Sequence, residues 1–505
     1  MLFRSIFTVF GENMGPANLI QAGFPLPTEL SGTSIRISAS GNDVSAFIIY
    51  TSATQLAAVL PSTTPLGPAI ARVTYNGQQG AALAFTVVAG SPGLFTLNSR
   101  GSGPAVLTAG PDFKVITYGN AALEGETLSA WATGVTALQG RADDTAAEAF
   151  DPPLTVEVIV GGIQANVRYR GRAPTLAGVD QIVFDVPMGV RGCNVSLLMK
   201  VGGAISNFTT LAVGGANRLC SDPGGLSEAD VAKARQDGLR IGAVTLKRNR
   251  TKVAVSGLGT VEQRADSASA DFTYYDAASF VRSQRSVSPG NCIVSTHAGE
   301  AAPPDSYSLV KLNAGAQLSL TGPGGTRAIN RDAATGLYAA SLGSAQVIPG
   351  FPTPGSGLFL DPGTYIVTGP DGPDVGAFIA RVTVPEPLAT SLDSIATVSR
   401  GASLTVTWTG GAANEYVAIR GFSSRSSPKV TATLTCIERA TAGRFTIPAE
   451  VFLAMPPSEV VQGAPMGELS VGSFPAIDVA RFMAGGLDVG YLSYSSIESK
   501  AVPFQ

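Results

Sequence analysis

Four cysteines give this chain its clearest capacity for covalent or metal chemistry: Cys193, Cys220, Cys292 and Cys436. A zinc site needs closely spaced ligands, and the nearest two cysteines are 27 residues apart, so we expect no zinc centre. Cys193 falls on an expected strand and Cys220 just after the last strand of the same expected unit. We therefore predict a Cys193–Cys220 disulfide that contributes about 2 to 4 kcal/mol. Cys292 and Cys436 fall in different expected domains, and two outcomes stay open: a disulfide that joins the domains, or two buried thiols.

The single histidine, His297, is the sole candidate for the base of a serine or cysteine hydrolase. Such a base needs a nucleophile and an orienting carboxylate, and the chain has no Gly-x-Ser-x-Gly turn. His297 lies in a polar segment that contains prolines, so we expect it in an exposed loop. The adjacent Asp143 and Asp144 are expected in a solvated loop, since neighbours in sequence rarely flank a glycosidic bond. We therefore expect no catalytic residues, and a hydrolase would require His297 to be catalytic.

Loop aspartates and Gly-Pro turns show no recognisable ligand-binding motif. Asp305, Asp361, Asp371 and Asp374 are expected in loops, but no twelve-residue calcium loop with alternating oxygen ligands surrounds them. The Gly-Pro turns lack the lysine and following helix of a phosphate-binding loop. Calcium binding by these loops stays an open alternative, and we assign neither a metal nor a cofactor.

Three tyrosines are the candidates for ligand binding, because an exposed aromatic ring can stack on a sugar: Tyr274, Tyr491 and Tyr494. Tyr274 and its neighbour Tyr275 would point to opposite faces of a strand, so only one can serve a given face. Tyr491 and Tyr494 are three positions apart in the sequence, so they too would point to opposite faces unless a β-bulge lies between them. A row of rings on one face is therefore not predicted.

Composition limits the class of protein that must hold these residues. The chain has 505 residues with a net charge of −3 and only 14% charged residues, so it lacks the positive surface of a nucleic-acid-binding protein. Many glycines and prolines separate short apolar runs, which is typical of many strands joined by turns. The one basic cluster, residues 247–252 (KRNRTK), is expected at an exposed turn or sheet edge.

The N-terminus and the hydropathy bear on localisation. No run of about 18 apolar residues occurs, so no transmembrane segment is expected. Residues 2–5 (LFRS) resemble the translation of a sequencing-adapter end, and a strand-like segment begins at Ile6. We expect a truncated start that has lost its signal peptide, and an extracellular or cell-surface protein.

An internal repeat organises the first half of the chain. Gln55, Pro61, Gly77 and Val87 each recur 126 residues later, as Gln181, Pro187, Gly203 and Val213. Upstream, Phe10, Ile35, Ile37 and Gly41 match Trp131, Val156, Val158 and Gly162 at an offset of 121, since the second copy carries five extra residues near 171–174. The second copy reads QIVFDVP where the first reads TQLAAVLP, so both segments are predicted to be strands that end before a proline. Asn76-Gly77 and Gly202-Gly203 predict hairpin turns.

Units of about 100 residues with closely spaced strands are typical of immunoglobulin-like sandwiches. The order of segments, from IFTVFGENMGP through PLGPAIARVTYNG and FTVVAGSPGLFTLN to SNFTTLAV, resembles a family of uncharacterised C-terminal domains of acidobacterial secreted proteins. That family is similar to the IPT/TIG class of immunoglobulin-like folds. The resemblance covers residues 5 to 215, implies a secreted or surface location, and supplies no catalytic residues.

The second half is predicted to hold one short helix and two further sandwiches. Ser227 fits an N-cap with Asp230 three residues on, and Gly238 fits the stop, so a helix is expected at about 227–237. Turns at 372–376 and 486–490, 114 residues apart, each lead into a last strand, and Pro385 and Pro387 mark a stiff linker. We thus expect an all-β chain of tandem immunoglobulin-like β-sandwiches with five segments: 1–90, 91–218, 219–239 with the helix, 240–385 and 386–505.

Two functions fit this organisation. The first is a non-enzymatic secreted or cell-surface protein with a structural, adhesive or scaffolding role. The second is a carbohydrate-binding accessory region of a larger secreted enzyme. The partner is expected to be a cell-surface or extracellular polysaccharide or protein, and not a nucleic acid.

Overall fold

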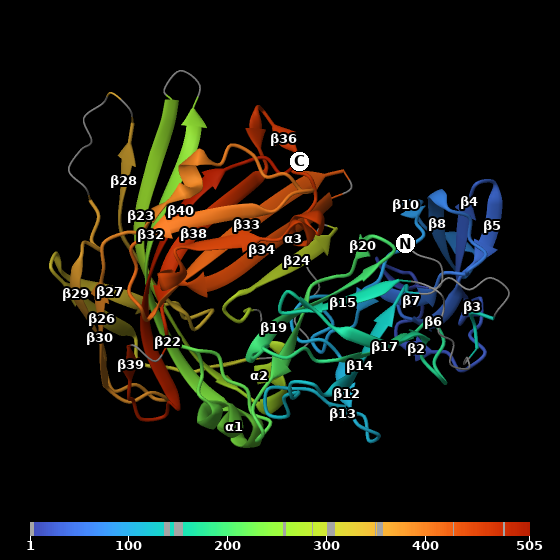
Figure 1. Cartoon of the computed structure of the whole chain (residues 1–505), viewed down its shortest axis with the longest axis horizontal. Helices are drawn as coiled ribbons and strands as arrows, with labels where there is room; N and C mark the ends of the chain where they lie inside the picture. The colour runs from blue at the N-terminus through green and yellow to red at the C-terminus, as the bar shows by residue number, and fades with distance from the viewer. Residues whose placement is uncertain are drawn as a thin grey trace.

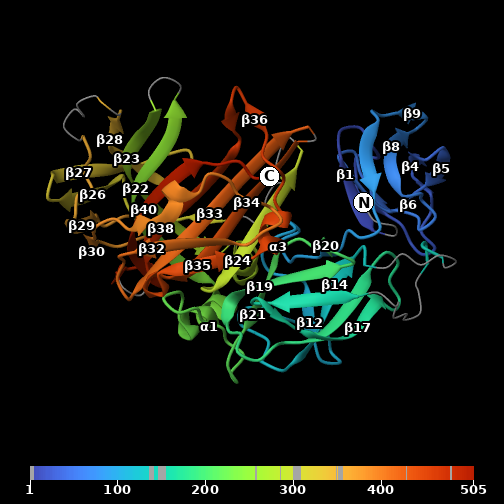
Figure 2. The same cartoon turned by 45° about the horizontal axis from the view of Figure 1, so that its top comes forward.

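The computed structural model describes residues 5–135, 142–145, 155–255, 259–284, 286–299, 309–348, 350, 357–427, 429–477 and 480–505. These residues form an almost entirely β protein of tandem immunoglobulin-like sandwiches, with a short connecting helix where the sequence predicts it. Figures 1 and 2 show the first two units, coloured blue to green, beside a larger body that holds the rest of the chain.

The first unit packs two antiparallel sheets, ordered β1-β7-β6-β2 and β10-β8-β4-β3, around a core that includes Ile35, Ile37 and Leu56. Its strands are β1 (Ile6–Phe10), β2 (Ile20–Gln21), β3 (Glu29–Leu30), β4 (Thr33–Ala39), β5 (Asn42–Ser45), β6 (Phe47–Thr51), β7 (Gln55–Val59), β8 (Gly67–Tyr75), β9 (Gln78–Gln79) and β10 (Leu83–Val87). The alanine-rich segment is therefore the strand β7, as predicted. Asn76 and Gly77 both have positive φ, 47° and 77°, which confirms the hairpin turn between β8 and β9.

The second unit repeats this arrangement with sheets ordered β13-β12-β14-β18-β17 and β16-β15-β19-β20. Its strands are β11 (Gly93–Leu94), β12 (Leu107–Ala109), β13 (Lys114–Val115), β14 (Thr127–Thr133), β15 (Val156–Val160), β16 (Ile163–Gln164), β17 (Asn166–Arg172), β18 (Asp180–Asp185), β19 (Gly192–Val201), β20 (Ala204–Ile205) and β21 (Thr209–Val213). Phe10 lies opposite Gln55 in the first unit, and Trp131 lies opposite Gln181 in the second. The repeat read from the sequence is thus a repeat of strand pairing.

Asp143 joins the two units and corrects an expectation. Its carboxylate Oδ2 accepts hydrogen bonds from the backbone N–H and the hydroxyl of Ser62, both at 2.7 Å, and the residue is buried. The Leu26 N–H also donates to the Asp144 carbonyl at 2.7 Å. The expectation of a solvated loop is wrong here, because these two residues fasten the second unit to the first.

The predicted helix is α1 (Glu228–Asp237), with Ser227 and Asp230 forming a full capping box and Gly238 ending it at φ 77°. Val231 and Ala234 are its buried residues. The helix lies between the second unit and the larger body of the second half of the chain (Figure 1). Arg481 pairs with Asp230 at 2.8 Å from the far end of the chain. Two further short helices are α2 (Ala277–Arg282) and α3 (Ala449–Leu453), and 3₁₀ turns are η1 (Ser391–Ser394) and η2 (Ala440–Ala442).

Across the described residues, the second half is built on one 14-stranded sheet, ordered β24-β34-β33-β38-β40-β22-β23-β28-β27-β26-β29-β30 with β25 and β39 attached. The strands up to the proline linker are β22 (Leu239–Val255), β23 (Gly259–Tyr275), β24 (Asn291–Ala298), β25 (Val310–Lys311), β26 (Gln317–Gly322), β27 (Gly325–Arg331), β28 (Tyr338–Val347), β29 (Gly363–Gly369) and β30 (Phe378–Val384). Those after it are β31 (Ala389–Thr390), β32 (Leu404–Thr409), β33 (Glu415–Ser426), β34 (Lys429–Arg439), β35 (Arg444–Ile447), β36 (Val460–Val461), β37 (Ala464–Pro465), β38 (Gly467–Pro475), β39 (Arg481–Phe482) and β40 (Val489–Ala501).

The segments 240–385 and 386–505 share this sheet, because β22 pairs in parallel with β40 over residues 241–252 and 489–500. Their folding as separate domains stays a prediction. A smaller sheet, β31-β32-β35, packs with a second core that includes the buried Trp408.

The basic cluster at 247–252 lies in the middle of β22, which is hydrogen-bonded on both sides, to β23 and to β40. The expectation of an exposed turn or edge is therefore wrong. Alternate residues of a strand point to opposite faces of the sheet, so the cluster divides into two sets of three. Lys247, Asn249 and Thr251 share one face, and Arg248, Arg250 and Lys252 share the other.

Both pairs of cysteines are joined. Cys193 and Cys220 form the predicted disulfide with Cα atoms 5.1 Å apart, and it connects β19 to the segment after β21. Cys292 and Cys436 form a second disulfide between directly opposed residues of β24 and β34. The second pair thus crosses the predicted domain boundary within one sheet.

Candidate binding site

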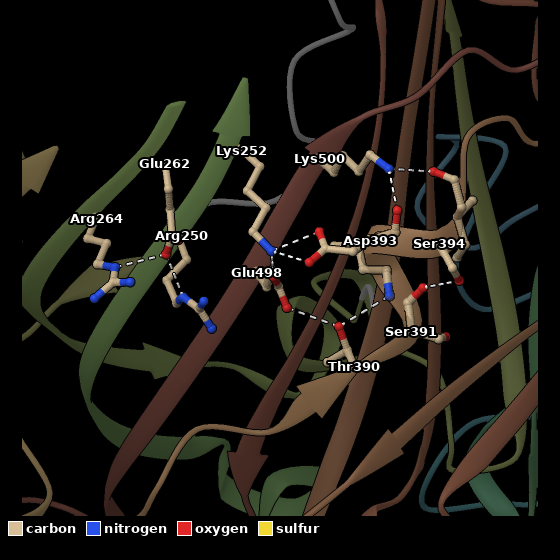
Figure 3. Close-up of polar contacts among 12 residues, drawn as sticks. Arg250, Lys252, Glu262, Arg264, Thr390, Ser391, Asp393, Ser394, Glu498 and Lys500 are labelled. Atoms are coloured by element: carbon tan, nitrogen blue, oxygen red, sulfur yellow. Dashed lines mark hydrogen bonds and ion pairs between the residues drawn. The ribbon is translucent and has the colours of Figure 1, made fainter. Parts of the chain in front are cut away.

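One face of β22 is a fully paired network of charges. Arg250 and Arg264 both donate to the Glu262 carboxylate at 2.8 Å, and the pKa of Glu262 falls to about 2 because these hydrogen bonds and charges outweigh its burial. Lys252 bridges Asp393 of η1 and Glu498 of β40, both at 2.6 Å (Figure 3).

Deeper on the same face, Arg248 makes a bidentate pair with Asp266, with both N–O distances 2.8 Å. The side chain of Asp266 is fully enclosed, and its carboxylate also accepts the N–H groups of Phe359 and Leu360. This face therefore joins β22, β23, β40 and η1 and has a structural role.

The other face of β22 lines a pocket of about 430 Å³, which we call the Lys247 pocket. It crosses five neighbouring strands, β22, β40, β38, β33 and β34. Its charged residues are Lys247, Arg420 and Glu468, its hydroxyl residues are Thr251, Thr433, Thr435, Ser470 and Ser499, and Asn249, Gly421, Phe422, Leu434 and Ile497 complete the lining.

The sheet register explains why the surface is hollow at this place. Thr435, Arg420, Ser470, Ser499 and Thr251 lie directly opposite one another on the five strands. Apart from Arg420, this row consists of short hydroxyl side chains, so the sheet face is low there. The lining residues on the adjacent rows are Asn249 and Ile497 on one side and Thr433, Phe422 and Glu468 on the other.

The electrostatics of the pocket differ from those of the paired face. Burial lowers the pKa of Lys247, and the nearby positive charge of Arg420 lowers it further. Partial desolvation at the sheet surface also lowers the pKa of Arg420 and raises that of Glu468, although both side chains are exposed to solvent, and a hydrogen bond from Ser499 partly offsets the rise for Glu468. Among the described residues neither Lys247 nor Arg420 forms an ion pair. The pocket can therefore supply two cationic donors and several hydroxyl groups to a ligand.

The three predicted tyrosines lie outside this pocket. Tyr494 is only 3% exposed within the core, so its ring is closed to ligands. Tyr274 donates a hydrogen bond to the Asp237 carbonyl, and Arg240 lies 5.8 Å from its ring centre. Tyr491 is partly buried against the second unit, and burial raises its pKa.

His297 lies in the strand β24 opposite Thr431, and not in the expected loop. Its Nε2 atom is buried without a hydrogen-bond partner among the described residues. Of the loop aspartates, Asp305 lies outside the described residues and Asp361 lies 3.7 Å from Arg248. In the part of the chain that the structure describes, no group of three or more His, Cys, Asp or Glu side chains could hold a metal ion.

Sequence reasoning missed Lys247, Arg420 and Glu468, although one signal was present. Arg248 and Asp266 are equally far along the chain from the Val255–Gly259 pair at the end of the β22–β23 ladder, as are Lys252 and Glu262. This mirrored spacing is the pattern of two antiparallel strands whose opposite charges pair. That pattern identifies Lys247 as a residue of the opposite face.

No protein-family model and no curated protein matches the chain. Among solved structures, an I-band fragment from titin aligns at 10% identity over 76% of this chain and 94% of its own, with a TM-score of 0.11. A Bacteroides ovatus glucan-utilisation protein, SGBP-B, in complex with a mixed-linkage heptasaccharide, aligns at 10% identity over 88% and 92%, with a TM-score of 0.14. A mutant Salmonella alpha-2-macroglobulin aligns at 11% identity over 99% and 30%, with a TM-score of 0.17. At such scores these likenesses establish no relationship, and the function must be inferred from the chain's own residues.

Proposed function

We propose that this chain is a non-enzymatic secreted or cell-surface protein that acts as an adhesive scaffold, with the Lys247 pocket as its contact surface. The observation that carries this proposal is the pocket itself. It lies on a central section of a long sheet, so its residues are held by backbone hydrogen bonds on five strands. A site held by regular strands keeps its geometry better than one built from loops.

The chemistry of the pocket supports binding over catalysis. It contains one carboxylate, Glu468, where a glycosidase uses two, and it contains no histidine or cysteine. The Nε2 atom of His297 has no hydrogen-bond partner among the described residues. These features favour a surface that holds a ligand without transforming it.

The two disulfides support an extracellular location, since such bonds persist in oxidising compartments. The resemblance of residues 5–215 to acidobacterial secreted proteins supports the same location. In the described residues, no helix is long and apolar enough to cross a membrane.

A carbohydrate-binding region of a larger secreted enzyme is the second candidate. One observation favours it: the Phe422 ring lines the pocket and is 38% exposed among hydroxyl side chains. Stacking on an aromatic ring and hydrogen bonds from hydroxyl groups suit a sugar.

Bead adhesion tests the proposal. Beads coated with the full chain should bind to a surface coated with mixed extracellular polymers, and the double variant Lys247→Ala, Arg420→Ala should bind far less. Arg381→Ala is the matched control, because Arg381 is exposed on β30 of the same sheet, outside the pocket. Equal adhesion of the double variant, or steady release of new reducing ends from the polymer, would contradict the proposal.

A further inference from the structure

The charged side chains on the two faces of β22 differ in whether they form ion pairs. On the paired face, Arg248, Arg250 and Lys252 each contact a carboxylate at 2.8 Å or less. On the pocket face, Lys247 of β22 and Arg420 of β33 both line the pocket and form no ion pair among the described residues, and Glu468 accepts a hydrogen bond from Ser499. Lys247 is half-buried and Arg420 is exposed, and a bound anion would give each cation a charge-assisted hydrogen bond that no acid among the described residues supplies.

The shape of the pocket favours an extended ligand. Five adjacent strands at about 4.8 Å spacing give a span of about 19 Å across the sheet. The floor is a row of hydroxyl groups, and Phe422 offers part of a ring at one wall. A small inorganic ion would use only one end of this surface.

We propose that the Lys247 pocket binds an anionic polysaccharide, with carboxylate or sulfate groups of successive sugars on Lys247 and Arg420. Sugar hydroxyls meet Thr251, Thr435, Ser470 and Ser499, and one sugar face lies against Phe422. Arg420 can hold a carboxylate through two parallel N–H donors, whereas Lys247 supplies a single ammonium. This inference rests on the proposed adhesive function and names its ligand class.

Other polyanions fit less well. A nucleic acid needs a cation for each of several closely spaced phosphates, and the pocket offers two cations and one carboxylate in a chain of net charge −3. An acidic peptide would present carboxylates but few groups for the row of hydroxyls. A sugar polymer with spaced charges uses both features.

Titration calorimetry with the full chain tests the inference. The probes are a polygalacturonate oligomer for carboxylates, a sulfated oligosaccharide of similar length, a neutral oligoglucose and a poly-glutamate peptide. We expect binding to one or both anionic sugars, weakened by salt, and clearly weaker binding to the other two. Arg420→Ala and Lys247→Ala should each reduce affinity about tenfold to a hundredfold, as expected for loss of a hydrogen bond to a charged group.

Two further variants make the result specific. Glu468→Gln should increase affinity for the anionic sugar, because it removes a repulsive charge, and Arg381→Ala should leave affinity unchanged. Matching thermal unfolding curves would show that the variants remain folded. Preference for the carboxylate or the sulfate probe identifies the anionic group.

Several outcomes overturn the inference: equal affinity for neutral oligoglucose, preference for poly-glutamate, no binding of either anionic sugar, or unchanged affinity in Arg420→Ala. If beads adhere to mixed polymers while these probes fail, the ligand class is wrong and the adhesive function stands. If the beads also fail to adhere, the proposed function fails with it.

Discussion

Replacing Asp266 with asparagine tests whether its ion pair holds the basic cluster inside the sheet. Asp266→Asn keeps an oxygen that can accept the Phe359 and Leu360 N–H groups but removes the charge opposite Arg248. Arg248 is left 11% exposed in its side chain, with Asp361 at 3.7 Å as its remaining acid.

We expect Asp266→Asn to lower the free energy of unfolding substantially. Removing one partner of a buried ion pair costs about 3 to 5 kcal/mol, and the nearby Asp361 places our expectation at about 3 kcal/mol. The double variant Arg248→Met, Asp266→Asn should recover more than half of that loss, because no uncompensated charge remains. Glu262→Gln is the matched control, since Glu262 belongs to a more exposed pair on the same face. Glu262→Gln should lower the free energy of unfolding by about 1 kcal/mol or less.

Hydrogen exchange of peptides from β22 and β23, read by mass spectrometry at pH 7, measures the local free energy of opening. It suits a multidomain chain better than a single melting point. The reasoning is refuted if Asp266→Asn loosens β22 and β23 no more than Glu262→Gln does. It is also refuted if the double variant is as unstable as Asp266→Asn alone.

Three other predictions concern covalent links and pH. Replacing Cys292 and Cys436 with alanine should destabilise the chain more than replacing Cys193 and Cys220. The first disulfide closes a loop of 144 residues and the second a loop of 27, for which the chain-entropy model gives about 5 and about 3.6 kcal/mol. Equal shifts in the urea midpoint of unfolding would contradict this. Burial raises the pKa of Asp222, so its protonated form favours the fold and that contribution is lost as pH rises through the folded-state pKa. Asp222→Asn should therefore raise the melting temperature at pH 7 but not near pH 3, with Asp371→Asn as control, and a gain only at low pH would count against it. The pKa of Glu262 is lowered to about 2, so its ionised form should stabilise the fold above its ordinary pKa by about 1 kcal/mol after solvent screening, and this contribution should be lost as pH falls towards 2. If the free energy of unfolding depends on pH in the same way in the original chain and in Glu262→Gln, this prediction is wrong.

Features encoded by neighbouring residues could be predicted from the sequence. The α1 helix needed only Ser227, Asp230 and Gly238, and the hairpin after β8 needed only Asn76-Gly77. The repeat offset identified β7 as a strand although its alanines favour a helix, because the second copy at β18 is rich in β-branched residues. Each of these signals lies within a few residues or within a second copy of the same unit.

Features that depend on distant pairing could not be predicted. The parallel contact of β22 with β40 joins residues separated by about half of the chain, and it turns an apparent edge into a central strand. The acids that neutralise the basic cluster include Asp393 and Glu498, which no local pattern connects to Lys252. The Lys247 pocket is even harder to predict from the sequence, because its row of hydroxyl groups forms only when five strands pair in the correct register.

The contrast between the two faces of β22 is the strongest reason to look for a ligand at the pocket. On the paired face, each cation has an acid within hydrogen-bonding distance. At the pocket, the one lining acid, Glu468, forms no ion pair with Lys247 or Arg420 among the described residues, and the neighbouring side chains include the hydroxyl groups of Ser470 and Ser499. Sequences commonly depart from local stability rules at functional sites. Lys247 and Arg420 form no ion pair among the described residues, which is such a departure, and they lie on the open face of the sheet, where a polymer can reach them.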